Sequence, residues 1–349
     1  MASGLIDWDL AARAAKRFSP PSPGTSLHEA EETVSDLYRA TASAADRVAE
    51  LTLLSEPPVT AITRVIDRAA WIDTNAGGLR TIMDPLVGRL TEDHPVGRVA
   101  QSVGGRLTGV QVGLVLGFLS GKVLGQFEFF ERSGGQLLLV APNLVAVERQ
   151  LKVDPHDFRL WVCLHEVTHR VQFTAVPWLR QHMLDEVDAL TAAIDTDPAE
   201  LRRRLSGAVG ELVKVVRGQD DGTGLLAVLA TPEQRVVLDR VTAFMSLVEG
   251  HAEWVMNAVP ASVIPSQKVI ESRFAARRQR SGNPLDRLLR RLLGMEAKTR
   301  QYTDGSAFVR AVVERIGVAD FNAIWTSSQT LPSKAEIADP ARWIARVHA

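Results

Sequence analysis

The chain has 349 residues, of which 46% are hydrophobic and 23% charged, and a formal net charge of −1. This is the composition of an ordinary globular protein, and the balanced charge argues against nucleic acid or an anionic membrane as the main partner. The single cysteine, Cys163, allows no internal disulfide, and the N-terminus has no continuous apolar core. We therefore expect a cytoplasmic protein without a signal peptide.

Helical patterns fill the N-terminal part of the chain. Ser26, with Glu29 three residues later, forms a capping box that predicts a helix over residues 27–54. Apolar residues at helical spacing predict two further helices, over 59–76 and 79–90.

Glycines recur every four residues in the segment that follows. This spacing predicts a helix whose glycine face lets another helix approach closely. A transmembrane helix is the alternative, but the apolar run over 110–124 contains Gln111 and Lys122 and is shorter than the ~20 residues that a span needs. We therefore expect no integral membrane segment. We expect instead a buried central helix that packs against a later helix, predicted over residues 155–173, or against the neighbours of that helix. The glycines are Gly105, Gly109, Gly113, Gly117, Gly121 and Gly125.

The clearest strand pattern is the apolar run at residues 136–140, which is bounded by Gly135 and Pro142. Helical patterns lie on both sides of it. The sequence therefore predicts a mainly α fold with a small β element before the helix at 155–173.

That helix carries an H-E-x-x-H pentad, His165-Glu166-Val167-Thr168-His169. Residues four apart share a helix face, so both imidazoles can reach one zinc ion, with Glu166 beside it as a general base. The helix is expected to begin at Asp154-Pro155, an N-cap followed by a first-turn proline. The alternative is a pair of core histidines. Cys163, on the apolar face, is expected to be a buried, inert thiol.

A third ligand is expected on a later helix, over residues 236–259. Glu249 and Glu253 lie four residues apart on one face, so one can bind the metal while the other accepts the N–H of a ligating histidine. His251 points about 200° away from Glu249. We expect Glu249 as the ligand, Glu253 as its support, and Gly250 as a point of close backbone approach. The alternative is a solvated face of an amphipathic helix.

Three other features complete the expectations. Residues 178–230 read as an insertion between the metal-binding helices. The basic run at 273–300 is expected to be a solvated helical face, with a polyanion or carboxylate site as the alternative. Tyr302 and His251 are candidates to stabilise an oxyanion, and a tyrosine packed against a carbonyl group is the alternative for Tyr302.

The pentad followed by Glu249-Gly250-His251-Ala252 resembles the gluzincin arrangement, in which a glutamate on a later helix completes the metal site. The spacing differs, because His169 and Glu249 are 80 residues apart here and the gluzincin glutamate lies much closer. The likeness is therefore to the site rather than to a whole catalytic domain.

Other matching motifs are spread over most of the chain, at residues 5–11, 65–68, 71–75, 165–173, 249–252 and 301–308. Together they resemble the bacterial zincin-like metallopeptidase family, one branch of which is associated with biosynthesis of the deazaflavin coenzyme. The resemblance implies an N-terminal helical region over 1–100 and a zincin-like catalytic region over 101–349, unless the two form one continuous domain. Zincins commonly present a strand edge to an extended substrate, which makes 136–140 the candidate edge. A purely structural strand is the alternative.

We therefore expect a zinc-dependent hydrolase, by its resemblance a metallopeptidase, that acts on a peptide or another amide. His165, His169 and Glu249 would bind Zn²⁺, and Glu166 would take a proton from the metal-bound water and pass it to the leaving amine. The alternative is a catalytically silent, zinc-stabilised scaffold or binding protein linked to coenzyme biosynthesis.

Overall fold

A computed structural model describes residues 6–57, 61–93, 98–130, 134–192, 232–279 and 295–348. The described residues form mostly helices and one three-stranded sheet, which confirms the mainly α fold with a small β element. The chain divides into two compact units. The first contains Met1–Arg47, Glu56–Arg170 and Ala261–Ile270, and the second contains Val48–Ser55, Val171–Pro260 and Glu271–Ala349. The division that the sequence suggests near residue 100 stays a prediction.

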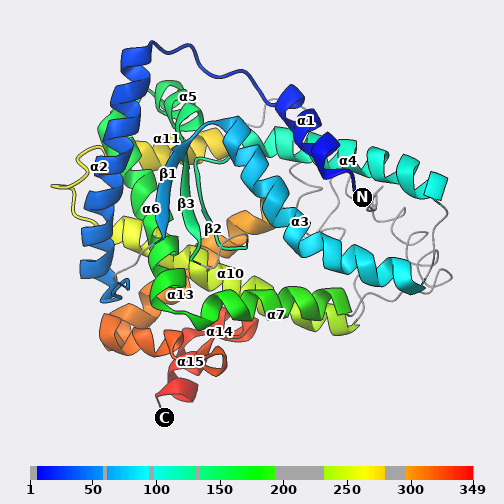
Figure 1. Cartoon of the computed structure of the whole chain (residues 1–349). Helices are drawn as coiled ribbons and strands as arrows, with labels where there is room; N and C mark the ends of the chain where they lie inside the picture. The colour runs from blue at the N-terminus through cyan, green and yellow to red at the C-terminus, as the bar shows by residue number, and fades with distance from the viewer. Residues whose placement is uncertain are drawn as a thin grey trace. The chain divides into compact units, whose positions relative to one another are not determined.

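The first unit combines the sheet with helices from the N-terminal half of the chain (Figure 1). Helix α2 continues from the first unit into the second, and so does α6. The elements are α1 (Trp8–Phe18), α2 (Leu27–Thr52), β1 (Ile62–Ile66), α3 (Arg68–Asp93), α4 (Arg98–Ser120), β2 (Gly125–Glu128), β3 (Gln136–Val140), α5 (Ala141–Leu151) and α6 (Pro155–Ala175).

Strand β3 is the middle strand of the sheet, in the order β1-β3-β2. It runs parallel to β1, with Ile62 opposite Gln136, and antiparallel to β2, with Gly125 opposite Leu139. All five of its residues are buried, which explains a continuous apolar run in place of alternation. The strand prediction at 136–140 is confirmed. Its expected role as a substrate-binding edge is wrong, because both sides of β3 are already paired.

Two helix predictions near the sheet need correction. The segment expected to be helical over 59–76 contains β1, whose β-branched residues pair with β3, and a helix begins only at Arg68. The side chain of Asp67 caps that helix by accepting a hydrogen bond from the Ala70 amide at 2.8 Å. From there α3 runs without interruption, so the expected break near residue 77 is absent from this helix.

The glycines within α4 pack against α1 and its N-cap, and not against the helix at 155–173 as expected; of the series, Gly125, which follows α4, does meet that helix, at Glu166. A Cβ on Gly109 would lie 2.6 Å from the Asp7 carbonyl oxygen, and one on Gly113 would lie 2.6 Å from the Ala11 carbonyl oxygen. Helix α1 offers alanines at this contact, so the two backbones meet closely. The opposite face of α4 is exposed, with Leu107 61% accessible. Glycine spacing predicted a close approach correctly, but it does not specify the partner.

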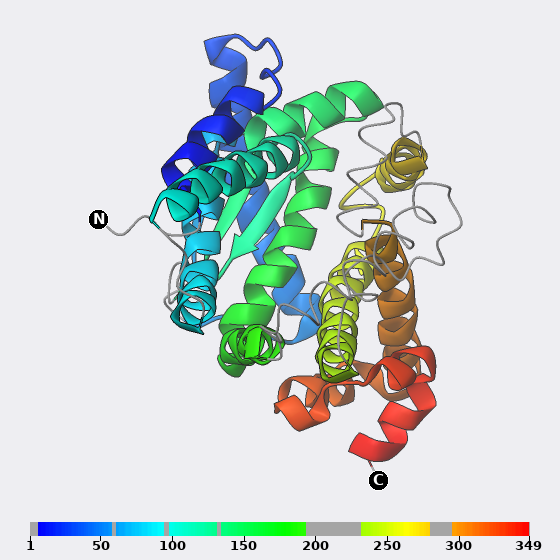
Figure 2. The same cartoon turned by 90° about the vertical axis from the view of Figure 1, so that its right-hand side faces the viewer.

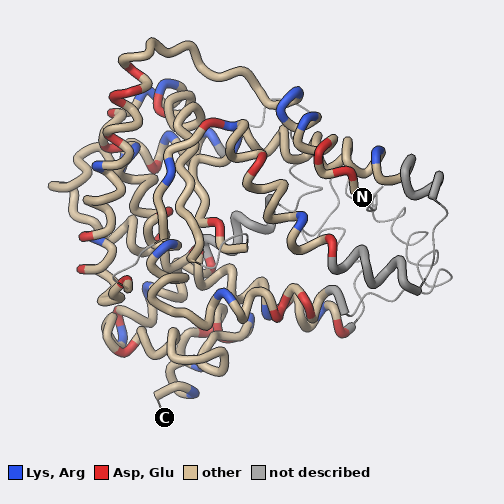
Figure 3. Tube along the Cα trace, in the orientation of Figure 1, with Lys and Arg blue, Asp and Glu red and all other residues tan. Residues whose placement is uncertain are grey.

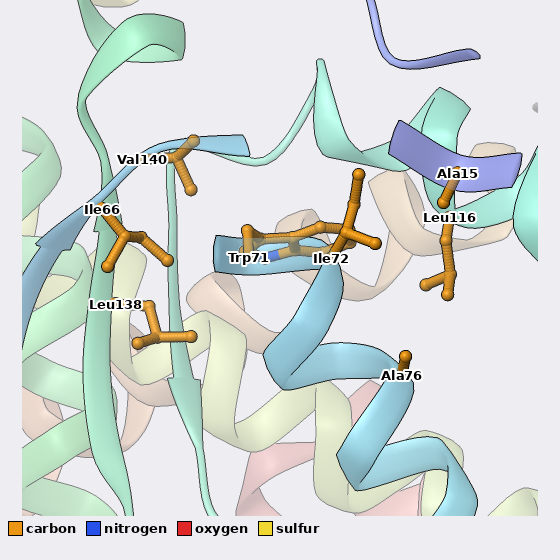
Figure 4. Packing of buried hydrophobic residues seen from close by; sticks show 8 residues of the cluster. All are labelled: Ala15, Ile66, Trp71, Ile72, Ala76, Leu116, Leu138 and Val140. Carbon is orange, nitrogen blue, oxygen red and sulfur yellow. The ribbon is translucent and has the colours of Figure 1, made fainter. Parts of the chain in front are cut away.

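Five elements of the first unit share a hydrophobic cluster (Figure 4). Trp71 and Ile72 of α3 lie near its centre, and the Trp71 indole N–H donates to the Gln126 side chain of β2 at 2.8 Å. This cluster joins two strands of the sheet to the helices beside it. Its buried residues are Ala15, Ile66, Trp71, Ile72, Ala76, Leu116, Leu138 and Val140.

The second unit is helical. Helices α10 and α13 lie side by side along much of their length (Figure 2), and Gly250 meets Gly305 where they touch. A Cβ on Gly250 would lie 2.1 Å from the Gly305 carbonyl carbon, so the close backbone approach expected at Gly250 is confirmed. The elements are α7 (Trp178–Ala192), α10 (Pro232–Ala258), α11 (Gln267–Gln279, which begins in the first unit), α13 (Met295–Phe321), α14 (Lys334–Ala338), α15 (Pro340–Val347) and the short 3₁₀ helices η1 (Asn322–Trp325) and η2 (Ser328–Thr330).

Parts of two predicted segments lie outside the described residues. Helix α7 opens the expected insertion at 178–230, and residues 193–230 are not described. The basic run at 273–300 is described only up to residue 279 and from residue 295. Lys and Arg are interspersed with Asp and Glu along the described trace (Figure 3). Among the described helices, none is long and apolar enough to cross a membrane.

Candidate metal centre

Helix α6 carries the pentad, and its N-terminus is built as the sequence predicts. The Asp157 amide donates to the Asp154 side chain at 3.0 Å, and Pro155 is the first helical residue. Phe158, Cys163 and Leu164 are fully buried in the apolar face. This face anchors the helix in the first unit, so the opposite side can carry the polar residues of the pentad.

His165 and His169 turn their outer ring nitrogens towards each other. The two Nε2 atoms lie 3.1 Å apart, and the ring planes meet at 86°. Two ligands at about 2.0–2.1 Å from one tetrahedral zinc ion are separated by about 3.3 Å. Both rings are half-buried, whereas a histidine pair serving only the core would be enclosed. The geometry therefore fits a shared metal ion.

Glu249 of α10 supplies the third ligand atom. One carboxylate oxygen of Glu249 and one nitrogen from each of His165 and His169 all lie within 4.8 Å of one another. The two histidines lie on α6, and the carboxylate lies on α10. Glu249 is only 6% exposed. A buried carboxylate beside two imidazoles is a donor set that suits zinc.

Glu166 is also buried, at 8% exposure, and its side chain lies against the first residue of β2. A Cβ on Gly125 would lie 2.5 Å from the Glu166 Cγ and 2.6 Å from its Cδ. The absence of a side chain at Gly125 thus makes the space that the Glu166 carboxyl group occupies. Four-residue spacing assigns Gly125 to the helical glycine series, although Gly125 follows the helix, so the spacing does not reveal this role.

The end of the pentad is tied to the sheet side of the first unit. Arg170 donates to both carboxylate oxygens of Glu56 at 2.9 Å and to the Thr63 hydroxyl at 3.2 Å. Both partners of this ion pair are largely buried, and a two-pronged arginine–carboxylate pair is geometrically selective. It restrains the helix directly after His169.

Cys163 takes no part in this polar arrangement. Its thiol lies 3.7 Å from the Thr41 hydroxyl and is completely buried. Burial raises the pKa of Cys163 to about 12, so it stays protonated and unreactive. The expected burial of this thiol is confirmed, and its inertness stays a prediction.

The other candidate residues are placed differently. The His251 ring is fully buried among Trp254, Phe321 and Trp325, which leaves no room for substrate and does not support its expected oxyanion role. Glu253 is half-buried one turn beyond Glu249, and its supporting role stays a prediction. Tyr302 lies in α13, but its side chain is outside the described part of the structure.

Comparisons with known proteins agree with this geometry. Residues 6–344 match the family described as zincin-like metallopeptidase. The chain is also similar to a crystal structure from Chloroflexus aurantiacus, provisionally described as a hydrolase with a novel fold. The two share 32% identity with a TM-score of 0.70, over 98% of this chain and 99% of the other. No curated protein matches this chain.

Proposed function

The chain belongs to the zincin-like metallopeptidase family, and from this premise we propose that it is a zinc-dependent peptidase with its centre at His165, His169 and Glu249. The observation that carries the proposal is the convergence of three ligand atoms within 4.8 Å, with a buried glutamate next to the first ligand in sequence. Membership of the branch associated with deazaflavin coenzyme biosynthesis stays a prediction.

The two imidazoles and the Glu249 carboxylate would hold the ion and leave a fourth position for water or substrate. When bound, zinc lowers the pKa of a water ligand and polarises a carbonyl group. Glu166 would act as the general base. Its carboxylate would accept a proton from the attacking water and deliver that proton to the leaving amine. The close contact of the Glu166 side chain with Gly125, together with its burial, limits the directions in which this carboxylate can point.

Because β3 is the central strand of the sheet, an extended substrate would have to pair with a different strand. Strand β2 is an outer strand of the sheet, and it begins at Gly125 beside Glu166. A peptide that adds to the outer side of β2 would pass the general base. We propose β2 as the substrate-binding strand on this basis.

The test is Glu166→Gln, which keeps the shape of the side chain and removes its ability to accept the proton. We expect the variant to retain parental zinc content and to lose roughly 10²–10⁴-fold in turnover of a fluorescence-quenched peptide library. Glu186→Gln, at a buried glutamate paired with Arg240, is the matched control and should retain activity. A parent that binds zinc but cleaves no peptide would favour a metal-stabilised scaffold.

A further inference from the structure

Gln172 lies three residues beyond His169 and seven beyond His165, on the metal-facing stripe of α6. It is fully buried. Its amide nitrogen donates to the Val248 carbonyl oxygen at 3.0 Å and lies 3.0 Å from Nδ1 of His251. All of these amide contacts lie within the second unit.

The direction of these hydrogen bonds follows from the acceptors. A carbonyl oxygen can only accept, so the atom of Gln172 that faces Val248 is the NH₂ nitrogen. Its second hydrogen is directed to Nδ1 of His251, which therefore accepts. The neutral His251 ring then carries its proton on Nε2, and one buried amide group joins α6 to two points on α10.

The stretch of α10 that Gln172 holds is fixed from other sides as well. The His251 ring stacks on Trp254 with an angle of 7° between planes and lies 5.5 Å from the Phe321 ring. Gly250 is in close backbone contact with Gly305 of α13. The helical turn from Val248 to His251 therefore contacts both α6 and α13, and Glu249 is one of the residues of this turn.

We propose that Gln172 is a positioning residue for the metal centre. Its amide joins the helix that carries both histidines to the turn that carries Glu249, and so sets the separation between the imidazole and carboxylate ligands. This inference rests on the proposed function, since it requires that these three residues bind zinc. Groups that hydrogen-bond directly to metal ligands are worth about 10–100-fold in metal affinity, and we expect an effect of the same order from a residue that holds the backbone on both sides of a ligand.

The experiment measures the zinc affinity of the full chain by competition with a chromophoric chelator, with zinc alone as the probe. Gln172→Met keeps an unbranched side chain of similar size and removes both hydrogen bonds. We expect zinc to bind about 10–100-fold more weakly to this variant. In a Glu249→Ala background the same substitution should change affinity by about threefold or less, because the ligand that Gln172 positions is already gone.

Trp343→Phe is the matched control, because it removes the hydrogen bond that the buried Trp343 indole donates to the Thr330 carbonyl within the same unit, at 2.8 Å. It should leave zinc affinity unchanged. If Gln172→Met does not fold, Gln172→Glu serves instead, since a carboxylate cannot donate to Val248, and the same loss is expected.

The inference is overturned if a Gln172 variant binds zinc as tightly as the parent. Equal losses with and without Glu249, or an equal loss in Trp343→Phe, would also overturn it, because the effect would then be one of general stability. A parent that binds no zinc refutes the proposed function itself, which is a distinguishable result.

Discussion

Gly125→Ala is expected to lower turnover strongly while the thermal stability of the protein stays the same. The new Cβ would lie 2.5 Å from Cγ, 2.6 Å from Cδ and 2.9 Å from Oε1 of Glu166. To restore an ordinary contact of about 3.4 Å, the Glu166 side chain must move by about 0.9 Å. The displaced atoms lie towards the end of a flexible side chain, so the fold can absorb the change. A general base displaced by about 1 Å can lose about 10²-fold in rate.

The assay compares turnover of the fluorescence-quenched peptide library, zinc content and thermal unfolding for the parent and the variant. We expect a loss of about 10²-fold in turnover, full zinc content, and a Tm that is unchanged or slightly higher, because alanine reduces the entropy of the unfolded chain. Gly134→Ala is the control, since a Cβ there has nothing within 4 Å, and it should retain parental turnover.

Parental turnover in Gly125→Ala would refute the reasoning, because Glu166 would then tolerate the displacement or not act as the base. A loss of zinc together with turnover would also refute it, since the predicted contact involves Glu166 and none of the three ligands. A large fall in Tm would indicate instead that β2 itself had been displaced.

Four further outcomes are expected. His169→Ala should purify without stoichiometric zinc, and metal analysis that finds full zinc would exclude His169 as a ligand. Cys163 should resist thiol reagents in the folded protein and react only in denaturant, because burial raises its pKa to about 12; rapid native labelling would contradict this. Burial lowers the pKa of His182 below its ordinary 6.5, so the unfolded chain takes up the proton first as the pH falls. The free energy of unfolding should therefore decrease below about pH 6.5, and urea titrations at several pH values should show a smaller decrease for His182→Gln; the same decrease in both proteins would contradict this. Gly305→Ala should lower Tm strongly, since its Cβ would lie 1.8 Å from the Ser246 carbonyl oxygen, and an unchanged Tm would show that α10 and α13 can separate at no cost.

Local sequence determined the parts of this protein that depend on a few neighbouring residues. The cap at Asp154 and Pro155, the apolar face of α6 and the four-residue spacing of His165 and His169 all act within one helix. Helical geometry converts that spacing into a shared direction, whatever surrounds it. The same periodicity favoured Glu249 over His251 as the third ligand candidate, and Glu249 is the residue grouped with the two histidines.

Only the tertiary structure decided which surfaces meet. Glycine spacing in α4 predicted a close contact, but its partner α1 was set by small residues that lie far away in the sequence. The Val59–Ala76 segment has helical spacing, yet part of it forms β1 because β3 offers a parallel partner. Strand β3 reads as a strand in sequence, but its central place depends on having β1 and β2 on either side.

The residues proposed to support the metal centre are also features that only the tertiary structure decided. Gln172 bonds to a carbonyl group 76 residues away, and Gly125 makes room for a side chain on a different element. Neither role leaves a periodic signal, because each depends on the fit of distant surfaces after packing, whereas a helix or cap is specified by backbone geometry over one or two turns.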